Sequence, residues 1–206
     1  MKILFSLFIP VLFLQSPLNG ETYDEYFMER VKEIESEKIE VKEKVETFKE
    51  KGDYLDYLKR AEDLLLEKGR ENEVIMLSSK SLKIKESFLG FFFRAYSLAE
   101  LNKHNDAITD LKAAIDINNQ SPAAFNNLGV SLTETGDNYS AINYFEKALK
   151  IDRELAIAYH NIGISKYNIG SKKSACDDFK KAAYLGRKST LEWIQSKDGS
   201  WCRNLR

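Results

Sequence analysis

The sequence repeats itself with a period of 34 residues, and this period constrains the fold more than any other feature. Between residues 88 and 189 three copies align without a gap. Aromatic or large apolar residues and small residues recur at fixed places in every copy. These places hold Phe91, Phe125 and Tyr159; Ala95, Gly129 and Gly163; Ala107, Ala141 and Ala175; Leu111, Phe145 and Phe179; and Ala114, Ala148 and Ala182.

Each copy is predicted to be a helical hairpin. Polar turn formers lie near its middle, namely Asn102-Lys103, Gly136-Asp137 and Gly170-Ser171, where one helix must end and the chain reverse. The small residues let paired helices approach closely, and the aromatic residues fill the space between successive hairpins. One hairpin buries too little apolar surface to offset an ordering cost of about 1.5 kcal/mol per residue. The hairpins must therefore stack, and both ends of the stack need caps.

The copy at residues 122–155, with AAFNNLG and AINYFEKALKID, resembles a tetratricopeptide repeat almost residue by residue. The copies at 88–121 and 156–189 are similar, although Arg94 stands where an aliphatic residue is usual and none of the three has the family's proline near the end of the second helix. The resemblance implies an all-α fold, a right-handed α-α superhelix or TPR solenoid. It also implies a protein-interaction function without enzymatic activity.

Two further segments extend the predicted stack. Residues 54–87 resemble a degenerate fourth repeat, with Ala61 in its first helix and a turn at Lys68-Gly69-Arg70 that is one residue longer than in the other copies. Residues 190–206 are expected to form a capping helix, at 190–197, and a tail. The predicted plan is thus one degenerate hairpin, three clear hairpins and a C-terminal cap.

Residues 21–53 form a charged segment with a heptad pattern of mostly apolar residues. The pattern predicts either a long amphipathic helix that folds onto the first hairpin or a coiled coil that makes a homodimer through residues 24–50. Lys38 interrupts the apolar seam and weakens both interpretations. The seam positions are Phe27, Val31, Ile34, Lys38, Val41, Val45 and Phe48.

Residues 1–20 have the layout of a cleavable signal peptide. Lys2 precedes an apolar run from Ile3 to Leu14, and a polar, turn-prone stretch ends at Gly20. The run is shorter than the roughly 20 residues of a membrane-spanning helix. No cysteine follows it directly, which disfavours a lipoprotein. We expect cleavage after Gly20, a periplasmic or secreted protein, and no stable membrane span afterwards.

The sequence offers little that could carry chemistry. Its two histidines, His104 and His160, have no second metal ligand at usable spacing, and there is no phosphate loop or nucleophile elbow. The 31 basic and 32 acidic residues give no overall positive field for nucleic acid. We therefore expect no catalytic residues, no metal, no cofactor and no nucleic-acid partner.

Cys176 and Cys202 are an even pair in a chain that carries an export signal, which predicts a disulfide. The geometry is favourable if the capping helix runs back antiparallel to the helix that contains Cys176. The alternative is a buried Cys176 and an unpaired Cys202 in a frayed tail.

The resemblance also implies a ligand groove, because the first helix of every hairpin lines the concave face in this family. Asn127 and Asn161 match the position whose amides hold an extended peptide backbone in superhelical members, although Phe93 occupies that position in the first copy. The alternative is that these amides only brace neighbouring helices. The predicted groove residues are Phe92, Tyr96, Asn126, Asn127, Val130, His160, Asn161, Ile164 and Tyr167.

The resulting prediction is an exported interaction module or scaffold that binds a protein or peptide in its groove. Chaperone-binding members of the family use basic residues in the groove to hold a terminal carboxylate. Among the matching positions of this chain only Asn127 is suited to that role, so this clamp is missing. The alternative is a structural protein that assembles through the heptad helix. Measuring the mass in solution before and after deletion of residues 21–52 would distinguish the two.

Overall fold

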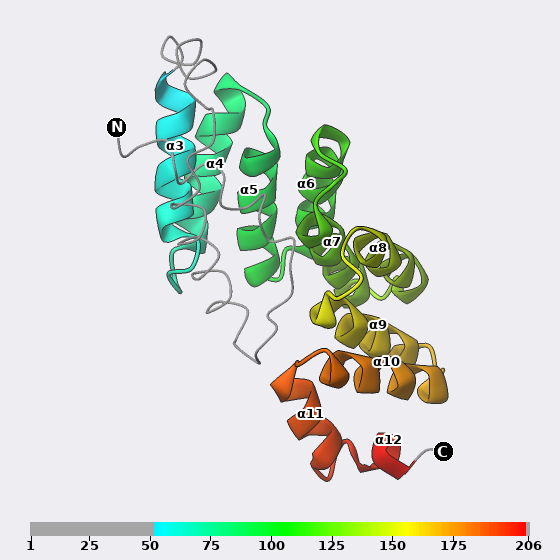
Figure 1. Ribbon diagram of the computed structural model, residues 1–206. Coiled ribbons are helices and arrows are strands. Elements are labelled where there is room, and N and C mark those ends of the chain that lie inside the picture. The colour runs from blue at the N-terminus through cyan, green and yellow to red at the C-terminus, as the bar shows by residue number, and fades with distance from the viewer. Residues whose placement is uncertain (1–51, 205–206) are drawn as a thin grey trace, which may run out of the picture. The chain divides into compact units, whose positions relative to one another are not determined.

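The computed structural model describes residues 52–204, and over this range the only regular structure is helix, which confirms the all-α prediction (Figure 1). The predicted signal peptide and the heptad positions 27–48 lie outside the described residues. Successive helices pack as pairs, as expected for stacked hairpins. The first pair, α3 (Gly52–Leu64) and α4 (Glu71–Ile84), occupies the segment of the degenerate repeat.

The chain divides into two compact units, whose described parts are an N-terminal unit at residues 52–119 and a C-terminal unit at 120–204. The first contains α3, α4, α5 (Phe88–Glu100) and α6 (His104–Ile117). In both units each helix packs mainly against its neighbours in the chain. The second unit contains α7 (Pro122–Glu134), α8 (Asn138–Ile151), α9 (Ala156–Asn168), α10 (Lys172–Tyr184), α11 (Lys188–Gln195) and α12 (Ser200–Asn204).

The 34-residue period is visible in the backbone of the turns. Asn102, Gly136 and Gly170 each have a positive φ, which reverses the chain after the first helix of a hairpin. Gly69 has the same conformation but lies 33 residues before Asn102, so the first turn contains one additional residue, as predicted. The linker between α3 and α4 is six residues long against three in the other hairpins, because α3 also ends two residues early.

Short polar side chains fix where several helices begin. Ser87 Oγ accepts a hydrogen bond from the Gly90 amide at the start of α5, and Ser121 Oγ accepts one from the Ala124 amide at the start of α7. The Asp137 carboxylate accepts a hydrogen bond from the Ser140 amide at the start of α8. These bonds satisfy backbone donors that have no partner within their own helix.

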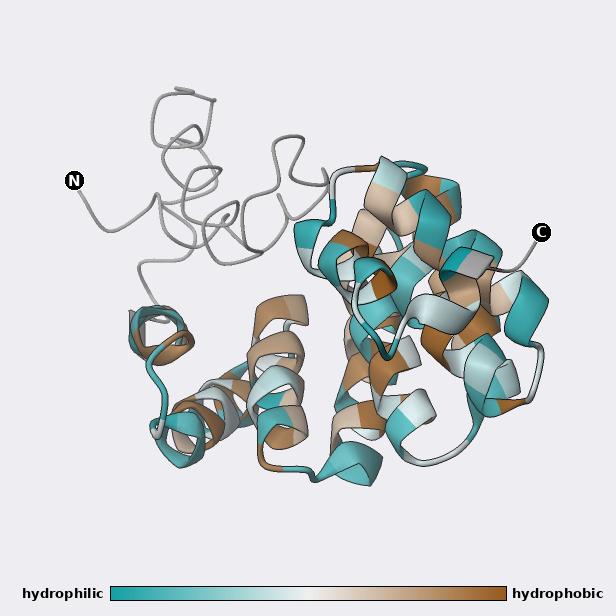
Figure 2. Cartoon of the chain, turned by 90° about the horizontal axis from the view of Figure 1, so that it is seen from below, coloured by the Kyte–Doolittle hydropathy of each residue, from teal (hydrophilic) through white to brown (hydrophobic). Residues whose placement is uncertain are grey.

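The interior is built from pairs of one small and one large residue across each hairpin. A Cβ atom on Gly129 would lie 2.5 Å from the ring of Phe145, and one on Gly163 would lie 2.6 Å from that of Phe179. The equivalent residues in the N-terminal unit are Ala95 and Leu111, both buried. In Figure 2 the helices carry both hydrophobic and hydrophilic residues, as packed amphipathic helices do.

Candidate functional site

A chain of side-chain amides links α7 to α9 in the C-terminal unit. Asn161 Nδ2 donates to Asn126 Oδ1 at 3.0 Å, and Asn126 Nδ2 donates a longer bond of 3.4 Å to Asn127 Oδ1. Asn126 is only 6% exposed, whereas Asn127 and Asn161 are half-buried. The chain runs in one direction, so its two ends are the Nδ2 donor of Asn127 and the Oδ1 acceptor of Asn161. Neither end finds a further hydrogen bond among the residues that the structure describes.

His160 lies beside these amides on α9 and contacts the C-terminal cap. Its Nδ1 atom is 2.8 Å from the hydroxyl of Thr190 on α11, and its ring packs against Phe179 at 5.4 Å between centroids. Thr190 is fully buried. Burial, and secondarily the charge of Arg187, lowers the pKa of His160 from 6.5 to about 4. His160 is therefore neutral near pH 7 and acts as a packed hydrogen-bonding residue.

The other predicted positions on the same two helices are apolar or aromatic. Val130 on α7 is half-buried, while on α9 Ile164 is 37% and Tyr167 is 44% exposed. Tyr167 also lies against Trp201 of α12, with 5.3 Å between ring centroids. We call the seven predicted positions on these helices the α7–α9 face: Asn126, Asn127, Val130, His160, Asn161, Ile164 and Tyr167.

The predicted groove residues of the N-terminal unit are placed differently. Phe92 is 3% exposed and stacks on Phe88 with 5.4 Å between centroids, and Phe93 beside it is fully buried. Tyr96 is half-buried. Phe92 is thus a core residue of its hairpin, and its replacement would test packing rather than contact with a ligand.

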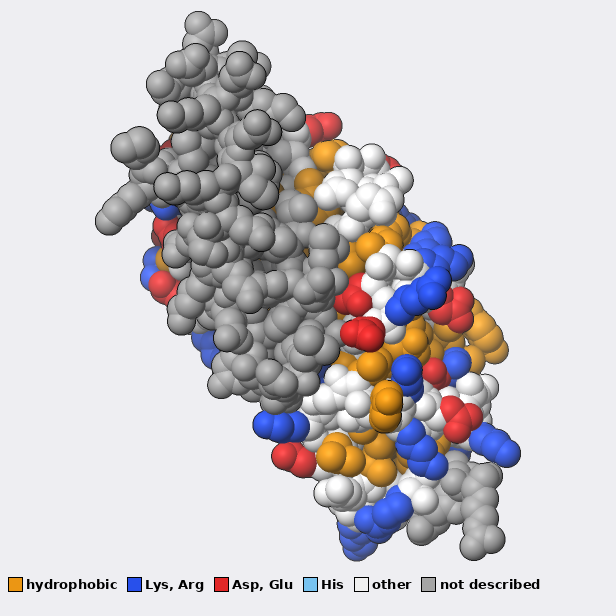
Figure 3. All heavy atoms as spheres, in the orientation of Figure 1, with side chains coloured by type: hydrophobic (Ala, Val, Ile, Leu, Met, Phe, Trp, Pro, Cys, Tyr) orange, Lys and Arg blue, Asp and Glu red, His pale blue; other side chains and the backbone are white. Residues whose placement is uncertain are grey.

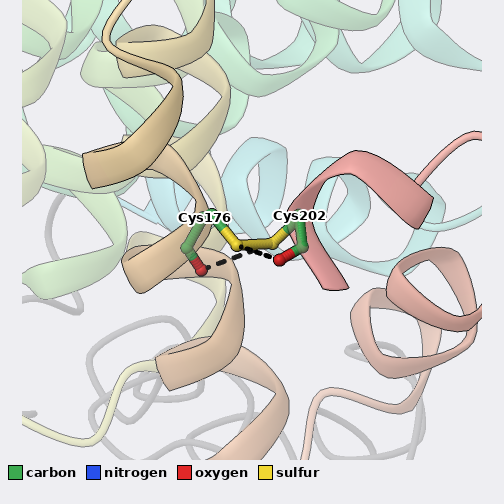
Figure 4. The surroundings of a disulfide bond; sticks show 2 residues. All are labelled: Cys176 and Cys202. Atoms are coloured by element: carbon green, nitrogen blue, oxygen red, sulfur yellow. Dashed lines mark hydrogen bonds between the residues drawn. A yellow bond between two sulfur atoms is a disulfide. The ribbon is translucent and has the colours of Figure 1, made fainter. Parts of the chain in front are cut away.

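The two cysteines join α10 to α12 in a disulfide, which Figure 4 shows. Their Cα atoms are 5.1 Å apart, and both residues are buried. Beside the disulfide, Phe179 packs on Trp193, with 4.8 Å between ring centroids. The tail therefore folds back onto α10 and closes the interior of the last hairpin.

Sequence reasoning did not identify α12, Thr190 or Trp201 as parts of this region. A helix of five residues is too short to show a hydrophobic period. The available signal was the presence of both tryptophans of the chain, Trp193 and Trp201, within the last 14 residues. Tryptophans in a tail indicate that the tail is packed.

The C-terminal part of the chain is basic. Residues 156–204 contain nine Lys and Arg against four Asp and Glu, and Figure 3 shows Lys and Arg side chains around α10, α11 and α12. Within residues 52–204 there is no cluster of residues suited to hold a metal ion, and no helix is both long and apolar enough to cross a membrane. Within the described residues, the α7–α9 face offers side-chain amides that can form hydrogen bonds and the exposed ring of Tyr167.

Family models match the middle of the chain. One described as "TPR repeat" matches residues 95–136, and one described as "Tetratricopeptide repeat" matches residues 122–155. A comparison with curated proteins finds no match.

Solved structures give the same answer for the fold. The chain is similar to one described as "Crystal structure of MamA", with a TM-score of 0.61 and 23% identity over 83% of this chain and 99% of that one. It is also similar to one described as "Crystal structure of YrrB: a TPR protein with an unusual peptide-binding site", with a TM-score of 0.63 and 18% identity over 83% and 81% of the two chains. The helical hairpins, the two matched repeats and these folds agree: the chain contains tetratricopeptide repeats within residues 95–155 and has the fold of a tetratricopeptide-repeat protein.

Proposed function

We propose that this protein is an exported interaction module that holds an extended segment of another polypeptide on the α7–α9 face. The amide chain from Asn161 through Asn126 to Asn127 carries this proposal. An extended backbone presents both N–H donors and C=O acceptors. The ends of the amide chain offer one acceptor, on Asn161, and one donor, on Asn127.

The hydrogen bonds within the amide chain favour binding because they restrict the side chains in advance. A free asparagine loses rotamer entropy when it binds a ligand, whereas one already held by a neighbour loses less. Asn126 is buried between the other two and orients both. In this arrangement bracing between helices and recognition of a ligand are compatible roles for the same amides.

The apolar members of the face supply the remaining contacts. Ile164 and Tyr167 are exposed on α9, and large side chains of this kind are typical anchors at protein interfaces. YrrB, which has the same fold, is described as having a peptide-binding site, and this supports a peptide ligand here. The family of this chain already makes it a module for contacts with proteins.

Export rests on residues 1–20 and has its own test. Expression of the full chain in a bacterium, followed by fractionation and mass spectrometry of the N-terminus, should give a protein that begins at Glu21 in the periplasm or medium. An uncleaved chain in the cytoplasm would contradict export and leave the interaction role untouched.

The binding proposal is tested with the mature chain, residues 21–206, against a displayed library of random peptides. Peptides selected by the wild-type chain should bind the double variant Asn127→Ala, Asn161→Ala at least about tenfold more weakly, a loss of about 1.4 kcal/mol. The matched control is Asn168→Ala. Asn168 Nδ2 also donates to an asparagine of the neighbouring hairpin, Asn138, at 3.0 Å, but both residues lie outside the α7–α9 face.

The two variants separate recognition from bracing, because each removes an amide bond between neighbouring hairpins. Equal binding by wild type and Asn168→Ala, together with weak binding by the double variant, supports the proposal. Equal binding by all three proteins would contradict it. Circular dichroism should show the same helix content in each.

A further inference from the structure

The cap formed by α11 and α12 contacts two residues of the α7–α9 face. Thr190 on α11 is 2.8 Å from His160 Nδ1, and Trp201 on α12 lies against the ring of Tyr167. Tyr167 is the most exposed aromatic residue of the face, at 44%. The last part of the chain therefore lies at the edge of the surface that we propose for the ligand.

Trp201 is held in this place from two sides. Its ring packs edge-on against Trp193 with 6.0 Å between centroids, and tilted against Tyr167 with 5.3 Å. Trp201 is half-buried, so part of the residue remains accessible to solvent. Lys172 lies over Tyr167, 5.8 Å from its ring centre, and adds a positive charge to the same edge.

The disulfide is the covalent tie of α12, beside the packing of Trp201 and a hydrogen bond of 2.7 Å from the Arg203 side chain to the carbonyl oxygen of Gln195. A helix of five residues is not stable alone in water. It is turned back at Gly199, where a Cβ atom would lie 2.1 Å from the carbonyl oxygen of Trp193, so that no other residue fits. Cys202, the residue after Trp201, then joins α12 to Cys176 of α10. The covalent bond is thus one residue away from the tryptophan whose position it fixes.

We propose that Trp201 is a ligand-contacting residue of the α7–α9 face and that the Cys176–Cys202 disulfide holds it there. Beside Tyr167 and Lys172 it selects an aromatic residue or proline of the bound polypeptide, with an acidic residue nearby in the ligand. Flat rings favour such side chains by stacking, and Lys172 favours the acidic group. This assignment rests on the proposed function and names the side chains that the ligand must carry.

The disulfide then makes binding dependent on redox state. When a dithiol reduces it, the bond between the two sulfurs breaks, each sulfur gains one electron and one proton, and the dithiol becomes a disulfide. Both cysteines are buried, so the reductant reaches them only when α12 opens. Without the bond α12 separates from α10, and Trp201 leaves Tyr167.

The test uses the mature chain, residues 21–206, with three variants: Trp201→Ala, Trp201→Phe, and Cys176→Ala with Cys202→Ala. The probes are peptides selected by the wild-type chain. Trp201→Ala and the double cysteine variant should bind them at least about tenfold more weakly, whereas Trp201→Phe stays within about threefold because a ring remains. The selected peptides should share an aromatic residue or proline with an acidic residue near it.

Tryptophan emission reports on the cap directly, because both tryptophans of the chain lie in it. The double cysteine variant should emit at longer wavelength than the wild type, and its helix content by circular dichroism should fall by no more than the five residues of α12. Unchanged emission and unchanged binding in that variant would overturn the role of the disulfide. Wild-type binding by Trp201→Ala would overturn the role of Trp201.

The outcomes also separate this inference from the proposed function. Peptides that depend on Asn127 and Asn161 but not on Trp201 would leave the proposed function in place and remove the role of Trp201. A wild-type chain that selects no peptide would remove both. A shift in emission would even then establish that the disulfide holds the cap.

Discussion

The hairpins α5–α6 and α7–α8 have the same helix arrangement but differ at two equivalent positions, one on each helix. One hairpin has an ionic pair there and the other has uncharged residues. In the N-terminal unit Arg94 on α5 makes two hydrogen bonds of 2.7 Å to the carboxylate of Asp110 on α6. In the C-terminal unit the equivalent residues are Leu128, fully buried, and Tyr144, whose ring stacks on Phe125. The comparison teaches that these two positions of the repeat accept either an ionic pair or uncharged, mostly apolar residues.

The largest effect should follow from removing one partner of the ionic pair. Asp110→Ala leaves the guanidinium of Arg94, whose side chain is 25% exposed, with only a 3.2 Å bond to Ser79 Oγ. We expect a loss of about 3 kcal/mol in the free energy of unfolding, measured by urea denaturation, because the charge stays withdrawn from water without its partner.

The double variant Arg94→Leu, Asp110→Tyr tests whether the two hairpins are interchangeable at this position. It copies the residues of α7 and α8, Leu128 and Tyr144, into α5 and α6 and should recover most of the stability lost in Asp110→Ala. A double variant as unstable as the single one would show that the two hairpins differ by more than this pair.

A smaller effect is expected from the pairs of small and large residues. Gly129→Ala places a methyl group 2.5 Å from the Phe145 ring and should lower the free energy of unfolding by about 2 to 3 kcal/mol. Adding Phe145→Leu recreates the Ala95–Leu111 pair of the N-terminal unit. The double variant should be more stable than Gly129→Ala, with a coupling of about 2 kcal/mol in a double-mutant cycle that includes Phe145→Leu alone. Additive losses would contradict the matched-pair explanation.

The same comparison shows what the sequence could predict. The small and large residues, because they recur every 34 positions, located the hairpins and the turns at Asn102, Gly136 and Gly170. The pairing of Arg94 with Asp110 was not predicted, since a charged residue on a helix usually faces solvent. Only the crossing of α5 and α6 brings these two side chains together.

The candidate site was predicted less completely, for a geometric reason. Phe92, Asn126 and His160 occupy equivalent positions. Phe92 and Asn126 are buried and His160 is half-buried, so this position packs largely against neighbouring helices. The contacts from Thr190 to His160 and from Trp201 to Tyr167 depend on how the tail folds back. That path is set by Gly199 and the disulfide, which no repeat pattern encodes.

The C-terminal unit also contains a pH-sensitive contact at His160. Because its folded pKa of about 4 lies below the ordinary 6.5, the unfolded chain binds more protons between these values, and stability is lost as pH falls through this window. In the wild type, His160 should lower the free energy of unfolding by about 2 kcal/mol between about pH 7.5 and about pH 5. We expect this part of the pH dependence to be absent in His160→Gln. Burial raises the pKa of Asp152 and Asp178, which acts in the opposite direction.

Because the aspartates act against His160, the quantity to measure is the difference in the free energy of unfolding between wild type and His160→Gln. It is obtained by urea denaturation at each pH. Parallel pH profiles of the two proteins would show that His160 is not the group responsible. A flatter profile in the variant would assign the acid-sensitive part of the stability to the contact between α9 and α11.

The smallest effect concerns the turns, where the two units differ by one residue type. Asn102 holds a φ of 58° that Gly136 and Gly170 adopt without a side chain. Asn102→Gly should raise the free energy of unfolding by about 0.5 kcal/mol, because relief of the backbone outweighs the added freedom of the unfolded chain. Gly136→Ala should lower it by about 1 kcal/mol although a Cβ atom there meets nothing within 4 Å. If Gly136→Ala instead cost as much as Gly129→Ala, the turns and not the matched pairs would set the stability of the hairpins.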